Sequence, residues 1–375
     1  MYKRPFYLIL LGFGIFLVSP LLGLFLNLKF EYSYYFDFFN NNYNIKIILI
    51  SFYQAFLSSF ISCIIAIFFS ISLFRQKKLF FIKFLISLSG FNFVLPSILV
   101  VYAYLGLYGK NGYFNTHLNI HNIFNWDSIF GLKAIIICHV LLNAPFATRL
   151  FFQNLNTIPS EYIDTSKSLR FTFLQNFVTI EWPFIKQSFA SIFSIIFILC
   201  FLSFAIVMSL GGSPRNSTIE VAIYHSLFFE LNFNKAVLLS FIQIFICSIF
   251  ILIGTKYLKG KSFFLISLNK YEYFYIKNKF IIFFDYFIIF IFSCFFFSPL
   301  IYILYSTFYY FDKTSILFEN IFFKCLFNSV LISFFTGLLV TFLSLIMGIC
   351  AVQLNKDSFK QKILFLLTSF GLLIS

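Results

Sequence analysis

The stretch Ile158-Pro159-Ser160-Glu161-Tyr162-Ile163-Asp164-Thr165-Ser166-Lys167-Ser168-Leu169-Arg170 is polar, yet long apolar runs flank it on both sides. A polar insert between two membrane spans must lie outside the hydrocarbon, where water satisfies its polar groups. Pro159 suits the start of a helix, because the first turn does not use the N–H that proline lacks. Ser160 and Glu161 add oxygen acceptors and negative charge there. The stretch predicts a helix, a turn and a second short helix at a membrane face, with Pro183 marking the end.

The composition of the chain is that of a membrane protein. It is 61% hydrophobic and 11% charged, whereas soluble domains carry roughly 25% charged residues. The sequence therefore predicts an all-α polytopic membrane protein with the lipid bilayer as its surroundings.

The apolar runs predict eight membrane spans and the beginning of a ninth. A proline at position 96 predicts a kink in the third span. Gly211 and Gly212 belong to a breaker cluster after the fifth, which predicts either a turn or a hinge. The spans are expected at about 5–26, 47–74, 79–107, 134–152, 189–210, 236–257, 280–305 and 327–354, with the ninth starting near residue 363.

The distribution of charge predicts an orientation. The chain holds 27 Lys and Arg against 13 Asp and Glu. Most of the positive residues fall on the side that carries the N-terminus, residues 75–78, the loop at 153–187, and residues 258–279 and 355–362. An excess of Lys and Arg marks the cytoplasmic side, so the N-terminus and the loop at 153–187 are expected in the cytoplasm. Since the positive residues are spread along membrane edges, the charge does not indicate nucleic-acid binding.

The cysteines and histidines show no site pattern. The seven cysteines lie in or beside apolar runs without short paired spacing, and the four histidines are not clustered. We therefore expect no disulfide framework, no metal site and no directly bound cofactor.

The polar loop resembles the cytoplasmic coupling loop of ABC importer permeases, which reads Glu-Ala-Ala, three residues, Gly, nine residues, Ile-x-Leu-Pro. Asp164-Thr165-Ser166 fall on Glu-Ala-Ala, and Arg170 falls on the Gly. Ile180-Glu181-Trp182-Pro183 fall on Ile-x-Leu-Pro without a gap, although Thr, Ser, Arg and Trp depart from the pattern. An ordinary amphipathic cytoplasmic loop is the alternative interpretation.

Further strings resemble the permease subunit of bacterial thiamine ABC importers over roughly residues 50–255, and beyond about 260 only the layout is similar. The strings, in chain order, are Ser51–Ser58, Leu95-Pro96, Tyr108-Gly109, His139–Pro145, Arg149-Leu150, Ile158-Pro159, Glu181-Trp182-Pro183, Ser209–Pro214 and Ser217–Tyr224.

This resemblance implies an ABC importer permease in a bacterial inner membrane that imports thiamine, either alone or together with its phosphates, by alternating access. It implies two copies of a cytoplasmic ATPase subunit and a periplasmic thiamine-binding protein as partners. The chain has no Gly-x-x-x-x-Gly-Lys-Ser/Thr phosphate loop, so ATP is expected to be hydrolysed by the partner and no catalytic residue is assigned. The resemblance assigns coupling to the ATPase to Pro159, Glu161, Asp164, Thr165, Ser166, Lys167, Arg170, Ile180, Glu181, Trp182 and Pro183.

Within the loop, Glu161, Asp164, Lys167 and Arg170 recur every three residues, which predicts one charged face for the ATPase or, alternatively, a merely solvated face. Trp182 is expected to anchor the loop at the membrane interface, or simply to lie there. Asp285 is expected at a membrane edge. No substrate-binding residue can be identified from the sequence.

Two other functions remain open. One is an ABC permease for another substrate, such as ferric ion or a polyamine. The other is a polytopic membrane enzyme, for which His117, His121 and Asp127 in an outer loop are the candidate residues.

A faint internal repeat relates residues 50–97 to 330–375, at an offset of about 280 residues. Hydrophobic spans resemble each other by chance, so the repeat is a weak signal. It predicts two fused halves, the first over 1–260 with about six spans and the second, beginning at 261, incomplete at 375. We therefore expect a fragment or a truncated gene product, or else a short form that pairs with another copy.

Overall fold

The computed structural model describes residues 32–76, 80–118, 130–212, 215–257, 279–309 and 320–353, together with five isolated positions before residue 24. Within these ranges every regular element is a helix. The chain divides into two compact units, Glu31–Ile303 on one hand and Met1–Phe30 with Leu304–Ser375 on the other. The predicted boundary between two halves at residue 260 falls in an undescribed segment and stays a prediction.

The unit Glu31–Ile303 holds most of the helices, and α16 (Asn320–Gln353) belongs to the other unit. The elements up to residue 309 are α2 (Tyr32–Asn40), α3 (Asn42–Arg75), α4 (Phe80–Val94), α5 (Ser97–Tyr108), α6 (Tyr113–Leu118), α8 (Leu132–Leu155), α9 (Ser160–Ser168), α10 (Phe173–Asn176), the π-helix η1 (Phe177–Glu181), α11 (Trp182–Phe201), α12 (Ala205–Leu210), α13 (Ile219–Phe228), α14 (Phe233–Tyr257) and α15 (Lys279–Tyr309).

Among the described residues, six helical segments are long and apolar enough to cross a membrane, which confirms the predicted fold class. They correspond to the second and the fourth to eighth predicted spans. The first and ninth predicted spans lie almost wholly outside the described residues. The six segments are Asn42–Arg75, Leu132–Leu155, Phe173–Phe201, Phe233–Lys256, Lys279–Tyr309 and Asn320–Ile346.

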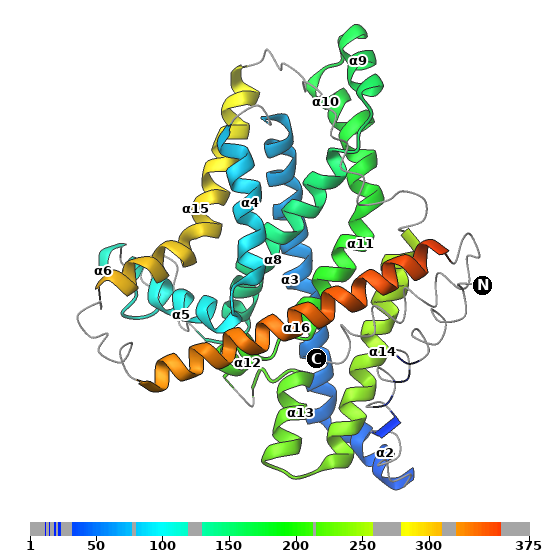
Figure 1. Ribbon diagram of the computed structural model, residues 1–375, viewed down its shortest axis with the longest axis vertical. Coiled ribbons are helices and arrows are strands. Elements are labelled where there is room, and N and C mark those ends of the chain that lie inside the picture. The colour runs from blue at the N-terminus through cyan, green and yellow to red at the C-terminus, as the bar shows by residue number, and fades with distance from the viewer. Residues whose placement is uncertain are drawn as a thin grey trace. The chain divides into compact units, whose positions relative to one another are not determined.

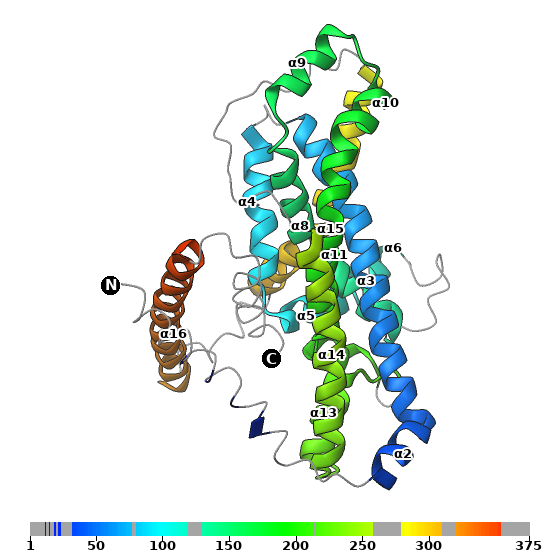
Figure 2. The ribbon, with the colours of Figure 1, turned by 90° about the vertical axis from the view of Figure 1, so that its right-hand side faces the viewer.

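Helix α3 lies at the centre of the larger unit, packed along α8 and α11, and α11 packs in turn along α14 (Figures 1 and 2). Small residues such as Ala55, Ser58 and Ser62 line the buried side of α3. Small side chains let helix backbones approach closely, and packing of this kind drives helix association in lipid. Small residues also lie where α11 packs on α14, and there the Ser191 hydroxyl donates to the Gly254 carbonyl at 2.8 Å.

Two of the predicted spans are interrupted. The third is split at Leu95-Pro96 into α4 and α5, because proline lacks the N–H that would continue the ladder. The fifth begins earlier than predicted, at Trp182 after η1, and it breaks after Phe201 before α12 resumes at Ala205. Pro183, expected to close the loop, lies instead in the first turn of α11.

The glycine pair after α12 forms a turn. Gly211 closes the helix with a bond from its N–H to the Val207 carbonyl at 2.8 Å. Gly212 has a φ of 65°, which favours glycine. The turn that the sequence predicts is present at this point, while a hinge here stays a prediction.

Candidate functional site

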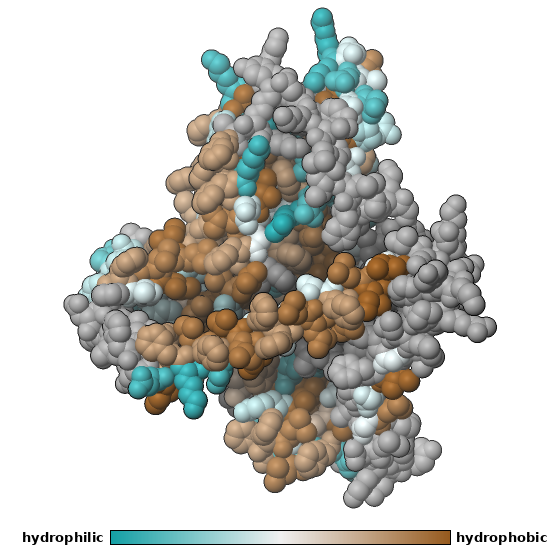
Figure 3. Space-filling model, in the orientation of Figure 1, coloured by the Kyte–Doolittle hydropathy of each residue, from teal (hydrophilic) through white to brown (hydrophobic). Residues whose placement is uncertain are grey.

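The polar stretch forms α9 at one end of the bundle, where hydrophilic side chains gather above mainly apolar helices (Figure 3). The helix begins at Ser160, and Pro159 is the extended residue before it rather than part of its first turn, where the sequence analysis placed it. Glu161 lies in the first turn and Lys167 in the last turn. Both charges are therefore favourable with respect to the helix dipole.

Helix α9 has a narrow attached side and a wide free side. Ile163 is only 4% exposed and Ser166 only 1%, and the Ser166 hydroxyl donates to the Ile163 carbonyl at 2.7 Å. The exposed residues from 161 to 170 are Glu161, Tyr162, Asp164, Thr165, Lys167, Ser168, Leu169 and Arg170. The helix thus presents charged and apolar side chains together on its free side.

The end of α9 differs from the predicted charged face. The helix stops at Ser168, and Arg170 has a φ of 54°. The Phe171 N–H bonds the Ser166 carbonyl at 3.0 Å and the Arg170 N–H bonds the Lys167 carbonyl at 3.1 Å. This is a Schellman motif with Arg170 at the left-handed position that glycine usually occupies. Arg170 therefore extends the charged surface past the helix end rather than along its face.

We expect Arg170→Gly to stabilise the folded protein by roughly 1 kcal/mol, because a side chain in the left-handed conformation costs about 1–2 kcal/mol. Thermal unfolding of the purified protein in detergent measures the effect. Ser168→Gly, which changes a residue inside the same helix, should have the opposite sign. Destabilisation by both substitutions would contradict this account of the helix end.

After α9, two short helical elements, α10 and η1, connect the chain to the bundle. Thr172 and Gln175 form a reciprocal capping box at the start of α10, with the Thr172 N–H donating to the Gln175 side chain at 2.8 Å. The π-helix η1 then leads into α11, carrying Ile180 and Glu181 into buried positions. Trp182 stays 42% exposed, which suits either role expected for it at an interface.

A groove of about 380 Å³ lies between α9 and the start of α11. Its lining is mainly apolar and includes two threonines. It is lined by Tyr162, Thr165, Leu169, Phe171, Thr179, Ile180, Pro183, Phe184 and Gln187. This groove brings together the two ends of the polar loop, which the sequence places about 20 residues apart.

Glu181 is held by a buried ion pair that the sequence did not predict. Its carboxylate accepts two bonds from Arg75, at 2.9 Å from Nε and 2.5 Å from Nη2, and the two side chains are 1% and 6% exposed. Asp285 on α15 lies 3.7 Å from Arg75 and accepts a bond from Gln76 at 3.3 Å. The Arg75 guanidinium also lies 4.3 Å from the centre of the Phe173 ring.

This Arg75 cluster joins the end of α3, the loop and α15. Asp285 is buried in this cluster, beside the residue that ends α3, while its expected place at a membrane edge stays a prediction. No local pattern reveals such partners, since Arg75 and Glu181 are separated by 106 residues and appear in the sequence only as part of a basic turn and a polar loop.

Of the three candidate residues for an enzyme, the structure describes only His117, so their grouping stays untested. His117 packs against Tyr113 on α6, with ring centres 4.6 Å apart, while His121 and Asp127 lie outside the described residues. Among the described residues, no three His, Cys, Asp or Glu side chains gather as a metal site.

No protein-family model matches the chain. Sequence relatives do: the thiamine transport system permease protein of Haemophilus influenzae is 35% identical over 222 residues, covering 58% of this chain and 40% of the relative. The proteins of that name from Escherichia coli and Brucella abortus are 33% and 31% identical, over 59% and 54% of this chain. The chain thus spans about 40% of the length of the curated relatives it matches.

A solved structure shares the fold. A chain from the crystal structure of a bacterial ABC transporter involved in the import of the acidic polysaccharide alginate aligns with a TM-score of 0.53. The alignment covers 66% of this chain and 90% of that chain at 15% sequence identity. This chain therefore has the fold of an ABC transporter permease, and across more than half its length its sequence is similar to thiamine transport permeases.

Proposed function

We propose that this chain is the membrane permease subunit of an ATP-driven importer and that α9 is the helix that docks on the ATPase. The observation that carries the proposal is the construction of α9. It is a short polar helix that leaves the end of an apolar bundle, with only Ile163 and Ser166 buried. A charged and apolar free side with a groove beside it suits a protein partner.

The Arg75 cluster gives this docking helix a mechanical connection to the spans. When two ATPase subunits close on ATP, a displacement of α9 passes through α10 and η1 to Glu181. Glu181 is bonded to Arg75 at the end of α3, and α3 packs along α8 and α11. A π-helix such as η1 is often found at functional sites. In the proposed mechanism, this connection lets the movement of α9 drive alternating access of the bundle.

The proposed substrate is thiamine, and the support for it is the sequence similarity to thiamine transport permeases at 31–35% identity. A periplasmic thiamine-binding protein would deliver the substrate to the face opposite α9. The excess of Lys and Arg in the other segments expected on the same side as the loop, among them residues 75–78 and 258–279, supports a cytoplasmic N-terminus and a cytoplasmic α9.

Uptake of labelled thiamine tests the substrate. A strain that lacks thiamine synthesis and other thiamine importers, and in which this gene is deleted, should lose uptake at low external thiamine. Restoring the gene with its partner genes should restore uptake, and a variant ATPase that cannot hydrolyse ATP serves as the control. Unchanged thiamine uptake in the deletion strain would point to another substrate.

A further inference from the structure

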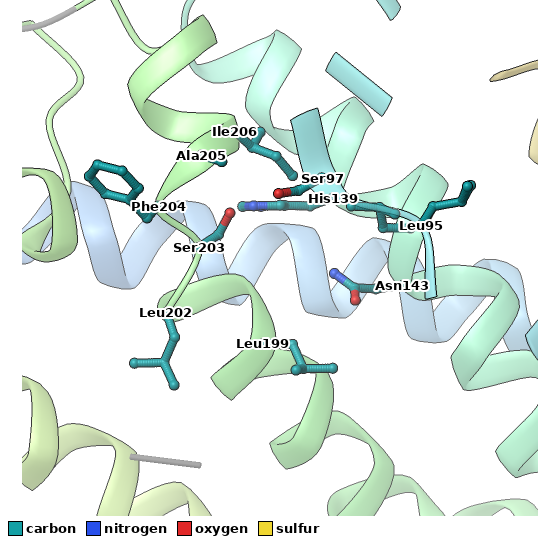
Figure 4. A pocket seen from close by; sticks show the side chains of 11 residues that line it. Leu95, Ser97, His139, Asn143, Leu199, Leu202, Ser203, Phe204, Ala205 and Ile206 are labelled. Atoms are coloured by element: carbon teal, nitrogen blue, oxygen red, sulfur yellow. The ribbon is translucent and has the colours of Figure 1, made fainter. Parts of the chain in front are cut away.

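A second cavity lies away from the α9 site. It has a volume of about 400 Å³ and is lined by α8 and by the two places where membrane helices are interrupted. Figure 4 shows the polar side chains of Ser97, His139, Asn143 and Ser203 around it. The volume is within the range of small-molecule sites, about 300–1,000 Å³.

The position of the helix breaks is the first argument that this cavity binds a ligand. One break, at Leu95-Pro96, separates α4 from α5, and the other, at Leu202–Phe204, separates α11 from α12. Both lie against the same cavity. Non-helical backbone at membrane depth is tolerated only where it is buried or lines a cavity. In secondary transporters, interrupted helices line substrate sites near the bilayer midplane, which is the precedent for a binding role here.

The second argument is an unsatisfied group on α8. His139 is 1% exposed, and its Nδ1 lies 3.3 Å from the Ser58 hydroxyl. Its Nε2 is buried and has no hydrogen-bond partner among the described residues. Buried polar atoms are nearly always paired, so one without a partner needs an explanation such as an absent ligand. One turn further along α8, Asn143 lines the same cavity and donates to the Cys200 sulfur at 3.2 Å.

The residues that line the cavity also limit the kinds of ligand that it can bind. Among the described residues, those that line the cavity include no Asp, Glu, Lys or Arg, and burying an unpaired charge is strongly unfavourable. An imidazole nitrogen and a carboxamide can supply both donors and acceptors. Phe204 at the break in α11 also lines the cavity, and its ring lies 5.2 Å from that of Tyr224.

We propose that this cavity binds an uncharged, planar nitrogen heterocycle through His139 and Asn143. This inference rests on the proposed import function and names the residues that recognise its substrate. In thiamine the aminopyrimidine is the uncharged ring, with an amino donor beside a ring nitrogen acceptor, and the thiazolium carries the positive charge. The aminopyrimidine therefore occupies the cavity, and the thiazolium extends beyond it.

Uptake kinetics test the assignment in membranes that contain this chain with its partner subunits. His139→Leu and Asn143→Leu should each raise the KM for thiamine about tenfold or more, the effect of about 1.4 kcal/mol. The matched control is Thr148→Val on the same helix, where the buried hydroxyl bonds the Ala144 carbonyl and lines no part of the cavity. Its KM should stay near that of the unchanged protein. Equal KM values for all three variants would overturn the proposal.

A labelling experiment covers the case in which the leucine variants fail to fold. Ser203→Cys places a thiol at the cavity, and labelling by a membrane-permeant maleimide is compared with the parent chain. Thiamine and its free aminopyrimidine half should slow the labelling, while the thiazole half should not. Protection by the thiazole half alone, or by neither half, would overturn the site. Protection by the aminopyrimidine without any thiamine uptake would keep the site and reject the proposed import of thiamine.

Discussion

Replacing Arg75 with alanine is expected to destabilise the protein by about 3–5 kcal/mol, the usual cost of breaking a buried ion pair from one side. The substitution leaves the Glu181 and Asp285 carboxylates buried without the guanidinium that they share. It also removes the contact with the Phe173 ring. Thermal unfolding of the chain in detergent, monitored by a probe of tertiary structure, measures the change.

Comparisons within the protein make this prediction specific. Lys167→Ala removes an exposed pair with Asp164 at 3.4 Å, for which about 0–1 kcal/mol is expected. Glu181→Gln should destabilise more than Asp285→Asn, because Glu181 makes two direct bonds to Arg75 and Asp285 lies 3.7 Å away. An Arg75→Ala protein as stable as the Lys167→Ala protein would show that the cluster contributes little.

Burying the charges of the Arg75 cluster costs free energy, and this cost suggests why the cluster lies where α3 meets η1. A buried ion pair is often no more stabilising than apolar residues of similar volume. Its advantage at this point is geometric, since two parallel bonds between a guanidinium and a carboxylate fix orientation as well as distance. The π-helix η1 is thereby held in one register against α3. In the proposed mechanism, that rigidity lets a movement of α9 reach the spans.

The sequence predicts the fold class and most of the spans because hydrophobic length is a direct consequence of bilayer thickness. It also predicts the start of α9 to within one residue, since Pro159 and Glu161 act through local chemistry. The left-handed Arg170 is the instructive exception. The loop pattern expects glycine there, and the structure shows why a flexible residue belongs at that position.

Features that depend on distant contacts could not be predicted. The break at Leu202–Phe204 contains neither proline nor glycine, so nothing in the local sequence interrupts the apolar run. Arg75, Glu181 and Asp285 meet only after three helices have packed. His139 and the two helix breaks likewise share one cavity through tertiary structure alone. The candidate substrate site was therefore absent from the sequence-based expectations.

Introducing an acid at Ile163 is expected to abolish coupling while the spans remain inserted. Ile163 is one of only two buried residues of α9, and Ile163→Asp both loses apolar burial and places a carboxylate in that environment. The combined cost is about 3 kcal/mol or more, which is about a hundredfold or more in the equilibrium between attached and detached helix. Copurification of the ATPase and thiamine uptake should both be lost.

The matched control adds the same charge to the free side of the same helix. Ser168 is exposed at the end of α9, and Ser168→Asp should cost about 0.3–1 kcal/mol through the helix dipole, plus a few tenths of a kcal/mol from the like charge of Asp164 one turn earlier. Cysteines placed at Tyr162 or Lys167 should crosslink to the ATPase in the Ser168→Asp background and not in the Ile163→Asp background. Because both variants carry one added carboxylate, a difference between them isolates the attachment of α9 from its charge. Crosslinking in neither background, with normal ATP-driven uptake in the Ser168→Asp strain, would mean that the ATPase docks elsewhere on this chain.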